Sequence, residues 1–437
     1  MEYSIPKGVF DILPEEPQKE DAWRNAAHWE YIEKIIRELA KDYGCREIRT
    51  PIFERTELFV RSVGETSDIV SKEMYTFTDK ADRSLTLRPE GTAPVIRSFI
   101  ENRLYTQRPI QKFFYIAPMF RYERPQAGRY RQHHQFGMEA IGVCSAEQDV
   151  EVIDLLTEFY RRLGLKNLKV AINTLGDQDS RAAYREALHK HFQLHLDRLS
   201  PDSKARFSRN IMRILDSKSP EDQEFIASAP SVLDFLSPAA KSHFEKVCAL
   251  LSALGLEWEI APRLVRGLDY YSHTVFEVSS GQLGAQNAIG GGGRYDGLIA
   301  SLGGPDIPAV GFGTGLERIL QTMEKQGVQF PSPPGPFIYF IPLGGQASLQ
   351  CMKWTAALRH SRIPAEVDLS GKKLQTCLQT ANLLQAVFCL VIGEDEQRSG
   401  KAQLKEMATH QSKEIVLDDL VGIIIQYHQE KKGKYHE

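Results

Sequence analysis

The spacing of apolar residues predicts a helix near the start of the chain, followed by strands. From Asp21 to Tyr43, apolar residues recur every three or four positions, and Gly44 stands where a helix ends. Arg46–Glu54 (REIRTPIFE) is typical of a strand interrupted by Pro51, which has to lie at an edge or a bulge. These residues therefore predict a helix that packs beside a sheet.

A strand, a turn and a second helix are expected over Leu85–Ile100 (LTLRPEGTAPVIRSFI). The turn falls at Pro89–Gly91, with Thr92 in the position of an N-cap and Pro94 in the first turn of the helix. Ile110–Phe120 is strongly β-prone and continues into a second strand. The two strands form the arms of an antiparallel hairpin.

The second arm of this hairpin alternates with period two, so its side chains separate onto two faces of the sheet. One face is apolar, while the other carries polar side chains and a glycine. We expect Gly137 to leave a gap in which a small ligand lies. The apolar face comprises Phe136, Met138 and Ala140, and the polar face comprises Gln135, Gly137 and Glu139.

Helices that alternate with hairpin strands predict an antiparallel α+β catalytic domain with a helical insertion. A proline-rich stretch, FPSPPGP, marks the best boundary, and the short apolar runs beyond it are typical of a parallel sheet in a small α/β domain. The predicted parts are residues 1–176 and 259–328 for the catalytic domain, 177–258 for the insertion, 329–336 for the linker and 337–437 for the α/β domain.

Composition narrows the possible functions without choosing one. With 437 residues and a net charge of −3, the chain is expected to form two or three domains, with only local patches for nucleic acid. The six cysteines are scattered without a C-x-x-C pair, which disfavours zinc and disulfides and fits a reducing, cytoplasmic location. Neither a signal peptide nor a run of eighteen apolar residues is evident, so no membrane association is expected.

Candidate chemistry starts in the loop of the hairpin, where four arginines fall within the eleven residues from Arg121 to Arg131, against Glu123 alone. Such a loop is suited to binding a phosphate, although an Arg-rich loop is also typical of a solvated surface. GFGTGLER adds glycines that let a flat base approach the backbone, with Arg318 on the helix that follows. Alone, that arginine is more typical of an ion pair with a surface carboxylate.

Two further segments suit an amino acid and its activated form. RGLDYY places Arg266 near Tyr270 and Tyr271, and Glu90 with Thr92 at a strand-to-helix turn suits an ammonium group. Aromatic packing and helix capping are the alternatives for these residues. Together, the segments favour a site that takes both a nucleotide and a small molecule.

These segments resemble the histidyl-tRNA synthetases, a family of class II aminoacyl-tRNA synthetases. FRYERPQAGRYRQHHQFGMEAIG is similar to motif 2 of that class and GFGTGLERIL to motif 3. LVRGLDYY and AIGGGGRYDGL resemble the two histidine signature segments. IPKGVFDILPEE, TLRPEGTAPVIR and AVFCLVIGEDE resemble the N-terminal, amino-binding and anticodon-binding segments. The resemblance covers nearly the whole chain and is weakest over residues 177–255.

The resemblance implies that histidine and ATP form histidyl-adenylate and pyrophosphate, and that histidine then passes to tRNA(His) with release of AMP. It assigns the α-phosphate to Arg121, with Arg266 in the same region, and the γ-phosphate to Arg318. With Glu90, these arginines are the expected catalytic residues. The remaining ATP contacts that it implies are Glu123, His133, Gly313 and Gly315.

The resemblance also implies the histidine and tRNA contacts. Glu90 and Thr92 bind the α-amino group, while Glu139 and Tyr271 read the nitrogens of the imidazole. The other implied histidine contacts are Gly91, Gln135 and Tyr270, and those to the acceptor end of the tRNA are Arg124 and Gln126. The resemblance further implies that Mg²⁺ accompanies ATP, while no zinc and no metal ion held by side chains alone is expected. It also implies a homodimer, with Arg46–Glu54 contributing to the interface between the two copies.

One residue departs from the family pattern. The first position of the HHQ tripeptide is usually Phe, which stacks on adenine, and here it is His133. An imidazole also stacks, but its charge varies near neutral pH. We therefore hypothesise that ATP affinity falls when His133 is protonated.

The sequence leaves two alternative functions open. A synthetase-like regulatory subunit of ATP phosphoribosyltransferase binds histidine without charging tRNA, but it normally lacks the C-terminal module and a complete RGLDYY. A class II synthetase for proline or threonine is disfavoured by the polar pair Glu139 and Tyr271, because proline offers no side-chain hydrogen bond.

Overall fold

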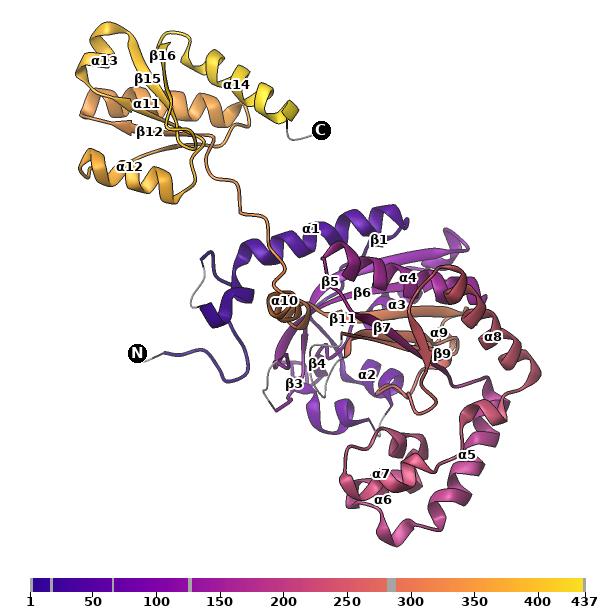
Figure 1. Cartoon of the computed structure of the whole chain (residues 1–437). Helices are drawn as coiled ribbons and strands as arrows, with labels where there is room; N and C mark the ends of the chain where they lie inside the picture. Colours follow the sequence, from indigo (N-terminus) through magenta and orange to yellow (C-terminus); the bar gives the residue numbers. More distant parts are fainter. Residues whose placement is uncertain (1–2, 16–18, 65–66, 125–127, 281–287, 435–437) are drawn as a thin grey trace. The chain divides into compact units, whose positions relative to one another are not determined.

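The computed structural model describes residues 3–15, 19–64, 67–124, 128–280 and 288–434. The chain divides into two compact units, Met1–Phe330 and Pro331–Glu437. Each unit is built around its own sheet (Figure 1). The finer division of the chain into an insertion and a linker stays a prediction.

An eight-stranded sheet organises the first unit, in the order β1-β5-β6-β11-β10-β9-β7-β8. The outer pairs β1–β5 and β7–β8 are parallel, and every pair between them is antiparallel. The predicted antiparallel α+β architecture is therefore confirmed. The strands are β1 Arg46–Glu47, β5 Gln111–Phe120, β6 Gln132–Ile141, β7 Leu168–Thr174, β8 Trp258–Ile260, β9 Ser272–Ser280, β10 Ala288–Arg294 and β11 Ala309–Gly315.

One face of this sheet is covered by helices and forms the main hydrophobic core. Phe136, Met138 and Ala140 of β6 are fully buried in it, as the alternating pattern predicts. The opposite face carries Gln135, Gly137 and Glu139, and it holds the site described below. The covering helices are α1 Ala26–Asp42, α4 Ala146–Arg162, α8 Pro238–Ala253 and α10 Leu316–Lys325.

The first long helix starts later than its apolar spacing predicts. α1 begins at Ala26 because the side chain of Asn25 accepts a hydrogen bond from the backbone N–H of Ala27 and caps it. A separate 3-10 helix, η1 Lys19–Arg24, precedes it. Gly44 follows the helix with φ +69°, a left-handed conformation that favours glycine.

Pro51 separates two strands that belong to different sheets. β1 joins the large sheet, while β2 Phe53–Arg55 belongs to a small sheet, in which β4 Ser84–Leu87 lies between β2 and β3 Tyr75–Thr78. The elements between and after these strands are α2 Thr56–Val63, η2 Ile69–Glu73, α3 Thr92–Glu101 and η3 Leu104–Thr106. The interruption at Pro51 is thus a change of sheet.

Several short helices follow β7, and we call residues 178–235 the helical segment (Figure 1). Its turns are fastened by the carboxylate of Asp222, which accepts hydrogen bonds from the hydroxyls of Ser200, Ser203 and Ser217. α8, which comes next, packs in the main core instead. The elements of the helical segment are α5 Gln178–Gln193, η4 Leu196–Arg198, α6 Pro201–Arg209, η5 Ile211–Asp216, α7 Pro220–Ala227 and η6 Val232–Phe235.

The second unit has a five-stranded sheet in the order β13-β12-β14-β15-β16. β12 is parallel to both of its neighbours, as the apolar runs predict, and the last two strands are antiparallel additions. No helix among the described residues is long and apolar enough to cross a membrane. The elements are β12 Ile338–Pro342, α11 Gly345–His360, β13 Ala365–Val367, α12 Leu374–Leu383, β14 Phe388–Ile392, α13 Glu394–Ser399, β15 Lys401–Glu406, β16 Ser412–Val416 and α14 Leu420–Lys434.

Candidate active site

Two cavities lie on the polar face of the large sheet, one of about 200 Å³ and one of about 560 Å³. They adjoin, because six residues line both. A ligand that occupies one cavity can therefore extend into the other. The shared residues are Arg121, His133, Arg266, Gly291, Gly313 and Gly315.

The smaller cavity collects residues that are far apart in the sequence. They come from the start of α3, from β6, and from Arg266–Tyr271 between β8 and β9, which we call the signature segment. The sequence-predicted residues that line this cavity are Glu90, Thr92, Gln135, Tyr270 and Tyr271. The structure thus brings together the groups that were expected to bind an amino acid.

Glu139 lies behind this cavity and is fully buried. Its carboxyl accepts hydrogen bonds from Thr92 Oγ1 at 2.8 Å, from Tyr115 at 3.3 Å and from the Tyr295 hydroxyl. Burial raises the pKa of Glu139 to about 8, against the effect of these donors. Three hydroxyl groups therefore fix the orientation of this carboxyl.

The prediction that Gly137 leaves a gap for a ligand is wrong, because a side chain of the protein fills that space. Tyr115 lies opposite Gly137 in the β5–β6 register, and a Cβ added at Gly137 would stand 2.2 Å from its hydroxyl oxygen. A Cβ at Gly91 would stand 2.5 Å from the same atom. Both glycines therefore make room for a phenol that holds Glu139, and ligand space lies elsewhere.

The glycines of β11 serve two different purposes. A Cβ at Gly313 would stand 1.8 Å from Gln135 Nε2, so this glycine accommodates an amide of the protein. Gly315 has no atom within 4 Å of such a Cβ and borders open cavity. Both glycines expected at the ATP line the cavities, but only Gly315 has room for a Cβ.

Glu90, and not Thr92, caps α3. The carboxylate oxygens of Glu90 accept from the backbone N–H groups of Thr92 at 2.7 Å and Ala93 at 2.8 Å. Thr92 is the first helical residue, and its hydroxyl is committed to Glu139. The N-cap expectation for Thr92 is therefore wrong. Burial raises the pKa of Glu90, while the two backbone donors oppose that shift.

The larger cavity gathers cationic side chains. Arg121 is anchored by its Nε, which donates to the carbonyl of Pro89 at 2.8 Å. Arg266 contacts Glu277 at 3.0 Å, and its buried Nε has no hydrogen-bond partner. Arg318 donates to the carbonyl of Ala288 at 2.5 Å, and burial, together with the charge of Arg129, lowers its pKa. Such a cluster suits a polyphosphate.

Two carboxylates, each with an oxygen that accepts no hydrogen bond, lie close to these arginines. Glu123 is 3.8 Å from Arg121 and 3.4 Å from Arg129, yet its buried Oε2 accepts no hydrogen bond. Glu317, which lines the larger cavity, likewise keeps a buried Oε2 without a donor. Within the described ranges, no group of three His, Cys, Asp or Glu side chains could hold a metal ion alone.

His133 lines both cavities, and its surroundings disfavour the change of charge near neutral pH that the sequence suggested. Burial, and then the charge of Arg121, lowers the pKa of His133 to about 3. A histidine with that pKa is neutral at every pH well above 3. We therefore expect an uncharged His133 ring from pH 6 to pH 8.

We expect the contribution of His133 to ATP affinity to be constant from pH 6 to pH 8. ATP itself titrates near this range, so the useful quantity is the ratio of ATP dissociation constants for the unmodified protein and His133→Phe. That ratio, measured by calorimetry at each pH, should not change. A ratio that rises several-fold towards pH 6 would show that His133 becomes protonated.

Of the two residues expected at the tRNA, only Arg124 is described, and it lines neither cavity. Arg124 is exposed in the loop between β5 and β6, and Gln126 falls outside the described residues. Sequence reasoning missed Tyr115 and Tyr295, whose hydroxyls hold Glu139. The sequence of their segments predicts only a strand or a turn. Their hydrogen bonds to Glu139 become visible only in the folded structure.

Comparisons with known proteins agree with this geometry. Residues 8–319 match the family model described as histidyl-tRNA synthetase, and residues 338–427 match an anticodon binding domain. Two histidine–tRNA ligases, from Protochlamydia amoebophila and Anoxybacillus flavithermus, are 56% and 48% identical. The alignments cover 96% and 97% of this chain and 99% and 98% of those proteins. The apo histidyl-tRNA synthetase of S. aureus superposes with a TM-score of 0.81 at 39% identity, covering 97% of this chain and 99% of that one.

A largely antiparallel sheet whose polar face carries these two cavities is the catalytic unit of a class II aminoacyl-tRNA synthetase. A second unit that matches an anticodon binding domain accompanies it. The chain belongs to the histidyl-tRNA synthetase family.

Proposed function

We propose that the protein attaches L-histidine to tRNA(His) through a histidyl-adenylate, with release of pyrophosphate and AMP. The observation that carries this proposal is the adjoining pair of cavities, one lined by amino-acid-binding groups and the other by arginines. The near full-length similarity to histidine–tRNA ligases supports the same activity.

In this proposal, the smaller cavity holds histidine. Glu90 lines it as a carboxylate anchored by two backbone N–H groups, which suits an α-ammonium group. Glu139 and Tyr271 read the imidazole, because a neutral imidazole offers one donor and one acceptor nitrogen. Buried polar groups at such a site reject ligands that leave them unpaired, by roughly ten-thousand-fold or more. Gly91, Thr92, Gln135 and Tyr270 complete the proposed set.

The larger cavity holds ATP in this proposal, with Arg121 and Arg266 at the α-phosphate and Arg318 at the γ-phosphate. The attacking carboxylate and the phosphate are both anionic, so fixed positive charge and alignment supply most of the catalysis. No side-chain nucleophile is required. His133 and Gly315 border the space proposed for the adenine.

A divalent cation such as Mg²⁺ fits beside the phosphates. Mg²⁺ is usually held by one or two carboxylates together with substrate phosphates, and Glu123 and Glu317 each have an oxygen without a hydrogen-bond donor. When bound, the cation would neutralise phosphate charge. The absence of a three-residue metal cluster in the described ranges is compatible with this arrangement.

Pyrophosphate exchange with each amino acid in turn tests the proposal. Histidine alone should stimulate exchange between pyrophosphate and ATP, and tRNA(His) should then accept the histidine. Binding of histidine without exchange would favour a regulatory subunit of ATP phosphoribosyltransferase. Exchange with proline or threonine would reassign the substrate.

We also propose that two copies associate through the small sheet. Phe53 and Phe77 are 51% and 42% exposed, and their ring centroids lie 6.2 Å apart. A paired apolar patch of this kind is typical of an interface. Phe53→Asp combined with Phe77→Asp is expected to give a monomer in sedimentation velocity. Leu194→Asp, at the end of α5 and outside the small sheet, is the matched control at a position that is 80% exposed and should leave the dimer intact. A double variant that remains dimeric would place the interface elsewhere.

A further inference from the structure

The signature segment contains cavity-lining residues but no helix or strand. Arg266–Tyr271 runs through bends and turns from β8 towards β9. Backbone of this kind has no ladder of hydrogen bonds to fix it, so its side chains are positioned only as well as other contacts hold it. Those contacts come largely from the helical segment.

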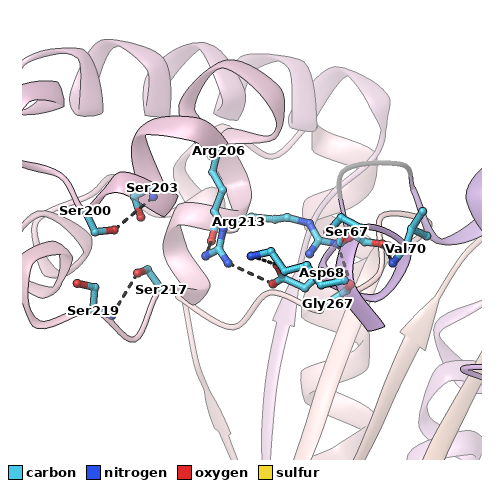
Figure 2. Close-up of polar contacts among 12 residues, drawn as sticks. Ser67, Asp68, Val70, Ser200, Ser203, Arg206, Arg213, Ser217, Ser219 and Gly267 are labelled. Carbon is cyan, nitrogen blue, oxygen red and sulfur yellow. Dashed lines mark hydrogen bonds and ion pairs between the residues drawn. The ribbon is translucent and has the colours of Figure 1, made fainter. Parts of the chain in front are cut away.

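Arg213, in η5, makes the densest set of these contacts (Figure 2). Its Nη2 donates to the carbonyl of Gly267 at 2.7 Å and to Asp269 Oδ1 at 2.9 Å, and its Nε donates to the same oxygen at 3.1 Å. Asn210 Nδ2 donates to Asp269 Oδ1 at 3.0 Å. The Arg213 side chain is 10% exposed. A guanidinium with this geometry fixes both direction and distance.

Asp269 is held from its other side by α2. Its backbone N–H donates to the carbonyl of Val63 at 3.2 Å. A Cβ added at Gly64 would stand 2.2 Å from Asp269 Oδ2, so the carboxylate fits closely against that glycine. Asp269 is therefore clamped between η5 and the end of α2.

A second arginine of the helical segment fixes the end of the same stretch. Arg181 Nη1, in α5, donates to the carbonyl of Tyr271 at 3.3 Å. The two arginines thus hold carbonyls at positions 267 and 271. The residues around these positions that line the smaller cavity are Arg266, Leu268, Tyr270 and Tyr271.

We propose that Arg213 is a positioning residue that, through Gly267 and Asp269, sets Arg266 and Tyr271 for histidine and phosphate binding. Arg213 lines neither the smaller nor the larger cavity, so it acts through the signature segment. The helical segment thereby becomes part of the adenylation machinery. This inference rests on the proposed function, since it concerns the same site.

Arg213→Lys and Asp269→Asn test the inference in the full-length protein. Lys keeps the positive charge but lacks the planar guanidinium that bonds Gly267 and Asp269 together. A displacement of about 1 Å at a reacting group can lower the rate a hundredfold. We expect kcat for histidine-dependent pyrophosphate exchange to fall roughly ten- to a hundredfold. KM for histidine should rise. The double variant should be no worse than the poorer single variant, because both changes break the same contact between Arg213 and Asp269.

Arg206→Met is the matched control. Arg206 bonds Asp68 at 3.2 Å in the loop before η2, and it also donates to the backbone carbonyl of Arg213 at 3.2 Å (Figure 2). Arg206→Met therefore removes contacts that dock η5, while it leaves the Arg213 guanidinium on Gly267 and Asp269. Exchange kinetics should match those of the unmodified protein. If Arg206→Met and Arg213→Lys lower kcat equally, the contacts serve general docking and the inference is overturned.

Stability measurements separate a structural role from a positioning role. Thermal melting of Arg213→Lys and Asp269→Asn should stay close to that of Arg206→Met, while their kinetics differ. Unchanged kcat and KM in both variants, or activity lost only in step with unfolding, would overturn the inference. A parent protein without histidine-dependent exchange would instead overturn the proposed function.

Discussion

Arg266→His is expected to reduce histidine-dependent pyrophosphate exchange by a hundredfold or more while the fold is retained. Arg266 lines both cavities, and its buried Nε has no partner within the protein. A shorter and largely neutral imidazole cannot place a cation at the α-phosphate. Loss of one preorganised donor to a developing charge costs about a hundred- to a thousandfold in kcat.

The control for this variant is Arg198→His, in η4 of the helical segment. Arg198 is 63% exposed and pairs with Glu224 at 3.2 Å on the surface. Its exchange rate should equal that of the parent, and circular dichroism of both variants should show an intact fold. Near-normal exchange by Arg266→His would remove Arg266 from the catalytic set.

Arg294→Met is expected to lower the free energy of unfolding by about 3–5 kcal/mol, the usual cost of leaving a buried charge unpaired. The Arg294 and Asp149 side chains are both 0% exposed, and their ion pair joins β10 to α4. His243 and Thr274 also bond this carboxylate, but neither replaces a guanidinium fork. Urea unfolding of the full chain measures the loss.

Lys246→Met provides the comparison, because Lys246 pairs with Glu147 on the surface of the same layer of helices. Its removal should leave urea unfolding unchanged. Equal midpoints for Arg294→Met and Lys246→Met would contradict the assigned importance of the buried pair.

The pH dependence of the buried pair has a definite sign. Although burial acts to raise it, the contacts with His243 and Arg294 hold the pKa of Asp149 below its ordinary value. Stabilisation from this carboxylate is therefore present above its unfolded pKa, about 4, and disappears as the pH falls through the lower folded value.

The periodicity of apolar residues predicted the strands of the sheet well, because this periodicity depends only on which residues face the core. The alternation of Phe136, Met138 and Ala140 with polar neighbours placed β6 and identified its ligand-facing side. The parallel strands β12 and β14 followed from their continuous apolar runs in the same way. Both signals lie within one strand, so they can be read locally.

The polar details of the site could not be predicted, because they depend on partners from distant segments. Tyr115 reads as part of an apolar strand, yet its hydroxyl bonds Glu139. Glu90 reads as an ammonium ligand, yet it also caps α3. The low pKa of His133 arises from burial, and from Arg121 twelve residues earlier, which the sequence does not place beside it. Convergence of the arginines was suggested by the combination of segments and by family resemblance, because no local spacing relates residues so far apart in the chain.

The phenol wedged between Gly91 and Gly137 limits how the specificity of this enzyme can be redesigned. A methyl group at either glycine would meet the Tyr115 ring, so a single enlargement there would disturb the Glu139 carboxyl that this ring contacts. Conversely, trimming Tyr115 alone would leave a void beside two glycines and remove a donor from Glu139. Engineering a pocket for a bulkier histidine analogue therefore calls for coordinated changes at three positions on three separate elements.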